Sequence, residues 1–403
     1  EAIAADEANY NYSLTLPEVD TTKAFKPSTV KGSQFKKPLL EFSGSCAGCA
    51  ETSYARLVTQ LFGDRMYISN ATGCSSIWGG PAATSPYCTN KEGHGPAWCN
   101  SLFEDNAEHG FGMYLGQNAI RNSLIAKVKT VSEAECAPEE LKAAAKAYLD
   151  TVNDGEANGA ATKALVAALE GVDCDTCKSI LENKEYLAKK SVWIFGGDGW
   201  AYDIGYGGLD HVIASGEDVN ILVLDTEVYS NTGGQASKST PTGSVAKFAA
   251  GGKLTKKKDL GKIAMTYEYV YVAECSMGAD KAQFVKAISE AEAYHGPSLI
   301  ICYAPCINHG INMSKSQNEE KLAVESGYWQ LYRYNPSLIE KGQNPFSLDS
   351  KKPTGDYQAF LMGENRYAQL AKAKPEVAKE LFARNEKEAR IRYEEYSEMA
   401  KHE

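Results

Sequence analysis

Short apolar runs that alternate with helical patterns are the feature that most restricts how this chain can fold. Four such runs occupy residues 191–195, 219–224, 269–273 and 298–302, and the first two are followed directly by Gly or Asp. A helix is predicted between the last two, at about 279–294. Buried parallel strands have this short, continuous apolar character. Strand–helix alternation therefore predicts an α/β fold with a doubly wound parallel sheet, in which ligands bind at the carboxyl ends of the strands.

The rest of the chain divides into segments of different character. Residues 1–45 are polar with spaced prolines, which predicts an extended linker or arm, and Ala50–Leu61 has helical periodicity. Residues 63–118 are rich in Gly, Pro and Asn, so we expect them to be irregular but functional. A helical stretch is also predicted at 364–401. We therefore predict an extended arm, a cofactor domain with a helical insertion, and a helical C-terminal extension, at residues 1–45, 46–316 (insertion about 119–190) and 317–403.

Composition and charge exclude several classes of protein. Hydrophobic residues make up 43% and charged residues 23% of the chain, an ordinary balance for a soluble globular protein. No apolar run approaches about 18 residues, so no membrane-spanning helix is expected. The net charge of −10 argues against nucleic acid as a partner. The chain starts at Glu1 without Met or a signal-peptide pattern, so we expect part of a longer chain in the cytoplasm or, in a eukaryote, an anaerobic organelle.

A diphosphate–metal site is predicted where the first two apolar runs end. Gly196-Gly-Asp-Gly199 follows residues 191–195, and glycines there let the backbone approach a bulky anion. The carboxylate of Asp198 is the hard oxygen ligand that Mg²⁺ prefers. Asp225–Asn231 follows the second run, and adjacent parallel strands would bring the two loops together. Taken alone, Gly-Asp-Gly is also compatible with a plain structural turn.

Eleven cysteines are many for a chain of this size, and they favour metal or cluster ligation over disulfides. Their number is odd, their spacing is irregular and no secretion signal is present. Cys46-Ala-Gly-Cys49 places two thiols at the start of a predicted helix, and Cys74 follows. Cys306, just beyond residues 298–302, is the best fourth ligand. By themselves these four suit a [4Fe–4S] cluster or Zn²⁺ equally.

Other cysteines have weaker patterns. Cys302 competes with Cys306 on position alone, but as a mid-strand residue it should lie in the core. Cys174-Asp-Thr-Cys177 repeats the Cys-x-x-Cys spacing, yet it lies in the helical insertion without a second pair nearby. Its role stays open between ordinary thiols, a metal site and a disulfide.

Two longer blocks resemble those of the pyruvate:ferredoxin oxidoreductases. They are Gly197–Gly208, with the sequence GDGWAYDIGYGG, and Asp225–Gln235, with the sequence DTEVYSNTGGQ. The 26 residues 200–225 separate Gly-Asp-Gly from Thr226, at the interval where other thiamine diphosphate enzymes carry an Asn ligand. The family that the blocks resemble uses Thr at this place. Further segments, Thr89–Trp98 and Asn100–Ala107, resemble a family loop near the substrate.

The resemblance implies ligands for each cofactor. Asp198, the Thr226 hydroxyl and the Val228 carbonyl are the implied ligands of Mg²⁺ or Ca²⁺. Asn231 is the implied catalytic residue, facing the carboxylate or ketone of the substrate. The implied ligands of a proximal [4Fe–4S] cluster are Cys46, Cys49, Cys74 and Cys306. Contacts with thiamine diphosphate are implied for Glu51 (the alternative being an exposed helix position), Cys74, Gly197, Asp198, Gly199, Trp200, Thr226, Glu227, Val228, Tyr229, Ser230 and Asn231.

The resemblance also implies an oxidoreductase of anaerobic metabolism. The expected reaction is oxidative decarboxylation of pyruvate to acetyl-CoA and CO₂, with single electrons passing through the cluster to ferredoxin or flavodoxin. Expected partners are pyruvate, coenzyme A, a second copy in a homodimer, and a pyrimidine-binding and a ferredoxin-like domain from the same polypeptide or other subunits. The alternatives are another 2-oxo acid:ferredoxin oxidoreductase, a thiamine decarboxylase without redox chemistry, and a non-catalytic iron–sulfur or zinc electron-transfer module.

Overall fold

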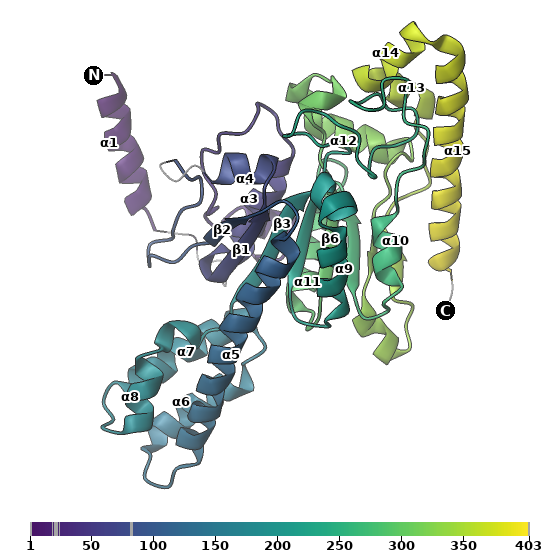
Figure 1. Cartoon of the computed structure of the whole chain (residues 1–403). Helices are drawn as coiled ribbons and strands as arrows, with labels where there is room; N and C mark the ends of the chain where they lie inside the picture. Colours follow the sequence, from purple (N-terminus) through teal and green to yellow (C-terminus); the bar gives the residue numbers. More distant parts are fainter. Residues whose placement is uncertain (1, 18, 20–22, 24, 81–83, 402–403) are drawn as a thin grey trace.

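An eight-stranded sheet forms the centre of the molecule in the computed structural model, which describes residues 2–17, 19, 23, 25–80 and 84–401 (Figure 1). The strand order is β2-β1-β3-β4-β6-β5-β7-β8, with six parallel strands followed by two antiparallel ones. The doubly wound parallel sheet is thus confirmed, with an antiparallel edge added. The strands are β1 Met66–Ala71, β2 Ala97–Ser101, β3 Ser191–Gly197, β4 Asn220–Asp225, β5 Tyr271–Cys275, β6 Ser298–Tyr303, β7 Tyr332–Tyr334 and β8 Phe346–Leu348.

The four predicted strands are β3, β4, β5 and β6, which lie together in the middle of the sheet. Every residue of β4, β5 and β6 is buried, as expected for parallel strands that are covered on both faces. The predicted helix between β5 and β6 is α11, Lys281–Ala293. It begins at Asp280, whose carboxylate accepts hydrogen bonds from the amides of Ala282 and Gln283.

Two strands, β1 and β2, lie in residues 63–118, so the prediction of an irregular segment there is wrong. β1 carries polar side chains that are buried and hydrogen-bonded inside the protein. Ser69 Oγ donates to Asn106 Oδ1 at 2.7 Å, and Asn70 Nδ2 donates to Ser75 Oγ at 2.8 Å. These partners make the burial tolerable. The same polar residues interrupt the apolar run by which a strand is recognised in sequence.

Helices cover both faces of the sheet. One face packs against α3, Glu51–Phe62, and α11, where the rings of Tyr54 and Phe284 meet edge to face with centroids 5.0 Å apart. The other face packs against α9, Tyr206–Ala214, and α10, Leu260–Met265. Each large apolar side chain buried in this way contributes about 1.5–3 kcal/mol. Because the helices lie along the faces, the loops at the strand ends are left to build a site.

The segment predicted as a helical insertion is helical and projects from the sheet, at the lower left of Figure 1. It starts earlier than expected, because the long helix α5 already begins at Asn106. Its own apolar core is separate from the two cores of the sheet. The side chain of Arg121 connects separate segments of the insertion, because it donates hydrogen bonds to the carbonyls of Leu187 and Val152. The helices are α5 Asn106–Glu133, α6 Glu139–Asp150, α7 Gly155–Leu169 and α8 Asp175–Leu181.

The two ends of the chain differ in part from their predictions. The N-terminal arm was expected to be extended, but α1 is helical over Ala2–Thr15, and a short helix α2 occupies Val30–Ser33. The C-terminal part is helical as predicted, although β7 and β8 precede its helices, and Pro375 starts a new helix within the stretch expected to be continuous. No helix of the described residues is both long and apolar enough to cross a membrane. The remaining helices are α4 Cys74–Gly79, α12 Ser316–Glu325, α13 Tyr357–Gly363, α14 Asn365–Ala373 and α15 Pro375–Met399.

Candidate functional site

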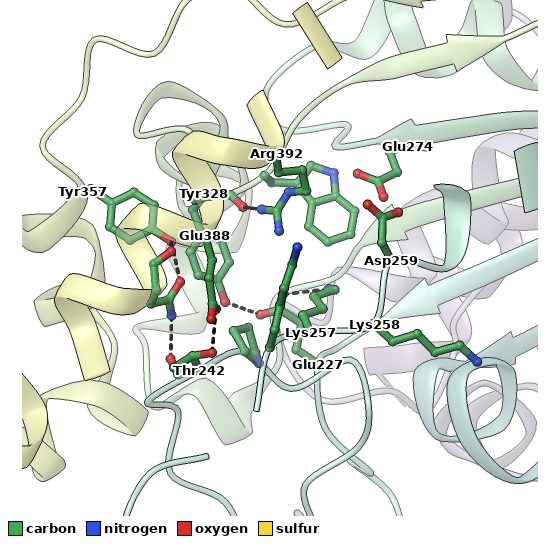
Figure 2. A pocket seen from close by; sticks show the side chains of 15 residues that line it. Glu227, Thr242, Lys257, Lys258, Asp259, Glu274, Tyr328, Tyr357, Glu388 and Arg392 are labelled. Carbon is green, nitrogen blue, oxygen red and sulfur yellow. Dashed lines mark hydrogen bonds and ion pairs between the residues drawn. The ribbon is translucent and has the colours of Figure 1, made fainter. Parts of the chain in front are cut away.

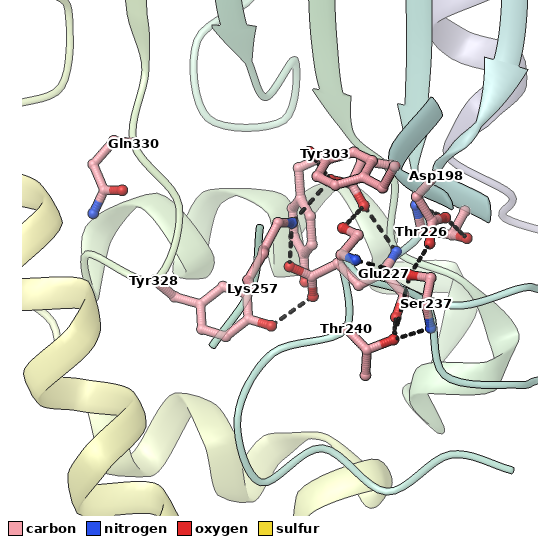
Figure 3. Close-up of polar contacts among 12 residues, drawn as sticks. Asp198, Thr226, Glu227, Ser237, Thr240, Lys257, Tyr303, Tyr328 and Gln330 are labelled. Atoms are coloured by element: carbon pink, nitrogen blue, oxygen red, sulfur yellow. Dashed lines mark hydrogen bonds and ion pairs between the residues drawn. The ribbon is translucent and has the colours of Figure 1, made fainter. Parts of the chain in front are cut away.

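Three oxygen atoms predicted to bind a divalent cation meet at the carboxyl ends of β3 and β4. The two strands pair in parallel, with Gly197 opposite Leu224, so their loops start side by side. Thr226 Oγ1 lies 3.0 Å from Asp198 Oδ1 and 2.9 Å from the Val228 carbonyl oxygen. Figure 3 shows Asp198 and Thr226 together beyond the strand ends. The structure therefore brings together the two loops that the sequence predicted would meet.

The spacing of these oxygens fits an octahedral cation. Oxygen ligands about 2.0–2.1 Å from Mg²⁺ at right angles lie about 3 Å from each other. The Thr226 hydroxyl has one hydrogen and cannot donate to Asp198 and Val228 at once. A cation would satisfy all three oxygens. Among the described residues no three His, Cys, Asp or Glu side chains are grouped to hold an ion, and the candidate ligands here are one carboxylate, one hydroxyl and one carbonyl oxygen.

Asp198 is held in a setting that disfavours its charge. Its side chain is buried, and this burial, together with the nearby Asp225 carboxylate, raises the pKa of Asp198 well above its usual range. Hydrogen bonds oppose the shift: Ser237 Oγ donates to Asp198 Oδ2 at 2.5 Å, and Thr226 donates to Oδ1. A divalent cation at this carboxylate would supply the positive charge that keeps it ionised.

The predicted glycines leave room at the end of β3. A Cβ atom on Gly197 would approach nothing closer than the Leu224 carbonyl oxygen at 3.8 Å, so open space lies beside this residue. A Cβ on Gly199 would come within 2.7 Å of the Tyr229 ring. Trp200 is buried against Gly196 rather than exposed to the open space. Gly197 thus leaves its backbone open to a bulky anion, whereas Gly199 makes room for the Tyr229 ring, and the contact of either glycine with a diphosphate stays a prediction.

Glu227 is the centre of a buried charge network. Its carboxylate accepts from Lys257 Nζ at 2.9 Å, from Arg366 at 2.8 Å and from the Tyr328 hydroxyl at 2.5 Å. Burial alone would raise the pKa of Glu227, but Lys257 and Arg366 outweigh it and bring the pKa to about 2. The residue also has a φ of 58°, a strained value for a side chain of this size. Glu227 therefore braces the loop, and its contact with the cofactor stays a prediction.

A second layer of polar residues, which the sequence did not predict, supports the same loop. Lys257 Nζ donates to Asp225 at 2.8 Å as well as to Glu227. His309 Nε2 lies 2.7 Å from the Thr226 carbonyl, and its other ring nitrogen lies 3.4 Å from Glu364. The run Lys256-Lys-Lys258 is a sequence signal that could have pointed to a charged partner. His309 and Glu364 lie in distant segments with no such signal.

A small enclosed cavity lies behind this network (Figure 2). Its volume is roughly 30 Å³, enough for about two water molecules. Glu227 and Lys257 line one part of it, and Glu274 and Arg392 line another. It is too small for a cofactor, whereas a larger pocket of roughly 390 Å³ is lined by Glu227 and Val228 of the same loop together with His309.

The four predicted cluster cysteines gather at the same edge of the sheet. Cys74 Sγ lies 3.1 Å from Ser230 Oγ, and Asn308 donates to Cys306 Sγ through its backbone amide at 3.5 Å. Burial is the main cause that raises the pKa of Cys74 to about 12 and of Cys306 to about 11. Cys306 and Cys46 also raise the pKa of Cys74, and Cys306 and Cys74 raise that of Cys49. The thiols therefore lie within electrostatic range of one another.

The competing sulfur, Cys302, is fully buried in β6 beside Cys275, so its prediction as a core residue is confirmed. All eleven cysteines are free thiols in this structure. The four candidate ligands do not form a compact single-ion site in the described part of the chain. Thiolates that bind different irons of a [4Fe–4S] cluster need not be that close to one another.

Glu51 is buried, so the exposed-helix alternative is wrong. It begins α3 directly after the Cys46–Cys49 loop, and Trp78 Nε1 donates to its carboxylate at 2.8 Å. Burial raises the pKa of Glu51 to about 7, against the opposing effect of the Trp78 hydrogen bond. A carboxyl group poised near neutral pH beside the cluster loop is a candidate for proton chemistry.

The end of the second loop faces outward. Tyr229 is half-buried and packs its ring against Phe103, with centroids 5.7 Å apart. Asn231, the predicted catalytic residue, is exposed. Its side chain is therefore free to meet a substrate, and its catalytic role stays a prediction.

Comparison with known proteins supports a thiamine diphosphate-binding domain in this part of the chain. Residues 179–302, which include β3, β4 and the metal ligand candidates, match the family described as "Thiamine pyrophosphate enzyme, C-terminal TPP binding domain". Over 99% of its length the chain is 59% identical to pyruvate:ferredoxin oxidoreductase of Moorella thermoacetica. Over 97% it is 56% identical to pyruvate-flavodoxin oxidoreductase of Klebsiella pneumoniae.

The chain is homologous to a portion of these oxidoreductases. It spans about a third of their length, 34% in both cases. The resemblance carried by Gly197–Gly208 and Asp225–Gln235 is thereby confirmed. A more distant relative is the mitochondrial pyruvate dehydrogenase [NADP(+)] of Euglena gracilis, 48% identical over 99% of this chain and 22% of its own. Among solved structures, 2-oxoglutarate:ferredoxin oxidoreductase of Magnetococcus marinus aligns with 66% of this chain and 65% of its own, at 14% identity and a TM-score of 0.39.

Proposed function

We propose that this chain carries the thiamine diphosphate and metal half of the active site of a pyruvate:ferredoxin or pyruvate:flavodoxin oxidoreductase. The observation that carries the proposal is the meeting of Asp198, Thr226 and Val228 oxygens about 3 Å apart at the ends of adjacent parallel strands. The named relatives are 59%, 56% and 48% identical to this chain over the part of their own length that it covers, about a third or less, and they support pyruvate as the substrate.

The residues of the chain have distinct roles in this proposal. Asp198, Thr226 and Val228 hold Mg²⁺ or Ca²⁺, which neutralises the diphosphate, while Ser237 fixes the orientation of the Asp198 carboxylate. Thiamine diphosphate, when bound, supplies the carbanion that attacks the ketone and the ring that accepts electrons as CO₂ leaves. Asn231 orients the substrate from its exposed position on the loop. Lys257 and Arg366 keep this loop rigid through their hydrogen bonds to Glu227.

The four cysteines are proposed to hold a [4Fe–4S] cluster next to this site. Ser230 supports the proposal, because it lies two residues after Val228 in the proposed metal-binding loop and its hydroxyl contacts Cys74. A cluster held by these cysteines would supply one-electron chemistry for the oxidation of the substrate, with ferredoxin or flavodoxin as the acceptor. Coenzyme A would accept the acetyl group.

The remaining parts of the active site are proposed to come from outside this chain. Since the chain spans a third of its relatives, we expect the pyrimidine-binding domain and the ferredoxin-like domain in the other two thirds. A homodimer and a cytoplasmic or organellar location also stay proposals.

The metal site is tested by Thr226→Val in the complete enzyme. The variant keeps the shape of the side chain but loses the hydroxyl, so we expect the Mg²⁺-dependent affinity for thiamine diphosphate to fall about ten- to a hundredfold. Calorimetry with the cofactor and Mg²⁺ measures the change. The matched control is Thr266→Val, whose hydroxyl donates to the Ile263 carbonyl far from the loop. Unchanged affinity in Thr226→Val would refute the metal assignment.

Metal analysis of anaerobically purified enzyme tests the cluster separately. Iron with acid-labile sulfide, lost in Cys306→Ser, is the expected result, whereas zinc in their place would contradict the proposal. Assays with pyruvate, 2-oxoglutarate and branched 2-oxo acids distinguish pyruvate from the other substrates of this class.

A further inference from the structure

A second Cys-x-x-Cys pair lies far from the cofactor edge of the sheet. Cys174 immediately precedes α8, and Cys177 lies in the first turn of that helix. Figure 1 shows α8 at the outer end of the helical insertion, away from the strands. The proposed cluster and metal site do not use either thiol.

The backbone holds the two cysteines of this pair against each other. The Cys177 amide donates to Cys174 Sγ at 3.3 Å. In the Cys46–Cys49 pair the corresponding amide donates instead to the Cys46 carbonyl, at 3.0 Å. The two motifs are therefore folded differently, and the motif in the insertion directs its first sulfur towards its second cysteine.

The two thiols have opposite environments. Cys174 is half-buried, whereas Cys177 is 1% exposed and packs in the apolar core of the insertion. A hydrogen bond from the Cys177 thiol lowers the pKa of Cys174, and burial raises the pKa of Cys177 to about 11. An accessible thiol whose pKa is lowered, next to a buried thiol whose pKa is raised, is the arrangement of a reactive dithiol.

The alternatives account for this pair less well. Cys136 lies near enough to raise the pKa of Cys177, yet within the described ranges no three ligating side chains are grouped to hold a metal. A purely structural disulfide would gain little here, because it would close a very short loop and remove little entropy from the unfolded chain.

We propose that Cys174 and Cys177 form a redox-active dithiol that exchanges with disulfides of small thiol compounds. The Cys174 thiolate attacks the disulfide, forms a mixed disulfide and releases one thiolate. Cys177 then loses its proton, attacks Cys174 Sγ and releases the second thiolate. The disulfide of the small compound is reduced to two thiols, and the two cysteine thiols are oxidised to the Cys174–Cys177 disulfide. Two electrons and two protons pass from the cysteines to the small compound, so the exchange balances.

Anaerobic equilibration of the enzyme with glutathione disulfide tests this proposal. After alkylation, residues 164–178 form one tryptic peptide that contains both cysteines, bounded by Lys163 and Lys178. We expect this peptide to lose the mass of two hydrogens and to recover it with dithiothreitol. Cys177→Ser should stop at a glutathione adduct on Cys174, and Cys174→Ser should form neither product. Before oxidation, Cys174 should alkylate several-fold faster than Cys136 at neutral pH.

The outcomes separate the proposal from its rivals. Cys136→Ser is the matched control and should leave the disulfide unchanged. A peptide that stays reduced, or a link from Cys136 to either cysteine, would overturn the assignment. Circular dichroism of each variant shows whether the insertion remains helical, and the Cys177→Ser adduct identifies the attacking thiol even if the variant is less stable.

Discussion

Ser230 stands where the two proposed cofactor sites meet. It lies two residues after Val228 in the metal-binding loop, and its hydroxyl is 3.1 Å from Cys74 Sγ. Asn308 Nδ2 reaches both the Ser230 carbonyl at 3.5 Å and Cys306 Sγ at 3.6 Å. At the scale of single residues, the sulfurs of Cys74 and Cys306 are therefore linked by hydrogen bonds to the loop proposed to hold the metal.

Replacement of Ser230 should change the cluster potential. A hydrogen bond to a ligating sulfur stabilises the reduced, more negative cluster, so Ser230→Ala should lower its reduction potential by tens of millivolts. A redox titration followed by electron paramagnetic resonance measures this shift. Ser314→Ala, which removes an exposed hydroxyl bonded to Asn312, is the control. An unchanged potential in Ser230→Ala would show that the hydroxyl does not act on the cluster.

Glu274 gives a prediction about pH. Burial raises the pKa of Glu274 to about 8, with Asp259 adding to the shift and Arg392 opposing it. In the unfolded chain Glu titrates near about pH 4.3, so the wild type loses stability as the pH rises from there to about 8. Glu274→Gln has no carboxyl group to ionise. Its free energy of unfolding, compared with that of the wild type, should therefore rise by a few kcal/mol between about pH 4.3 and about pH 8.

Urea unfolding at about pH 5 and about pH 8 measures the effect, because the difference between the two proteins should grow at the higher pH. Glu325→Gln, at a largely exposed position paired with Lys321, serves as the control. A difference that is independent of pH would mean that Glu274 titrates normally in the folded protein.

At the scale of elements, the C-terminal helices are part of the site rather than a solvated tail. Arg366 of α14 is buried, and its guanidinium contacts Glu227 at 2.8 Å and Glu364 at 2.6 Å. Glu364 in turn lies 3.4 Å from His309, whose other ring nitrogen contacts the Thr226 carbonyl. The start of α14 is thereby connected to the metal-binding loop by charged and polar contacts.

Arg366→Met should be strongly destabilising, because it leaves the carboxylates of Glu227 and Glu364 buried without their guanidinium partner. Breaking a buried pair in this way costs about 3–5 kcal/mol. The control is Arg384→Met in α15, where the half-exposed pair with Glu388 is worth about 0.3–0.5 kcal/mol. Chemical denaturation compares the two variants. Equal losses would show that the buried network adds little to stability.

At the scale of the whole molecule, the described residues form three separate apolar cores. Two lie on the faces of the sheet and one fills the helical insertion. The metal-binding loop and the candidate cluster cysteines are at the carboxyl edge of the sheet, whereas the insertion projects away from it (Figure 1). Changes inside the insertion should therefore have little effect on the cofactor edge.

Leu165→Ala tests this division. Leu165 is fully buried in α7, and its truncation should cost about 2–5 kcal/mol of stability in the insertion. Hydrogen exchange should quicken in α6, α7 and α8, while Mg²⁺-dependent binding of thiamine diphosphate stays unchanged. Leu209→Ala in α9, in the core of the sheet, is the contrasting variant. Weakened cofactor binding in Leu165→Ala would contradict the independence of the insertion.

Local sequence was sufficient for the features that local chemistry decides. The apolar runs predicted β3 to β6, because buried parallel strands need continuous hydrophobic side chains. Gly196–Gly199 at the end of β3 and Asp225–Asn231 at the end of β4 predicted that two loops would meet, since parallel neighbours end at one edge. β1 was missed because Ser69 and Asn70 look unsuited to a core until their partners are known.

Only the tertiary structure could decide which distant groups meet. Arg366 lies 139 positions after Glu227, and His309 lies 83 after Thr226, yet both pairs are in contact. The sequence also could not show that Glu51 is buried, or that Cys177 directs its amide to Cys174. Patterns in sequence report which side chains avoid water, whereas the pairing of polar groups depends on the packing of whole elements. The sequence by itself therefore indicated the four central strands and the two loops that meet at their ends, and the folded chain determined the network that holds that edge in place.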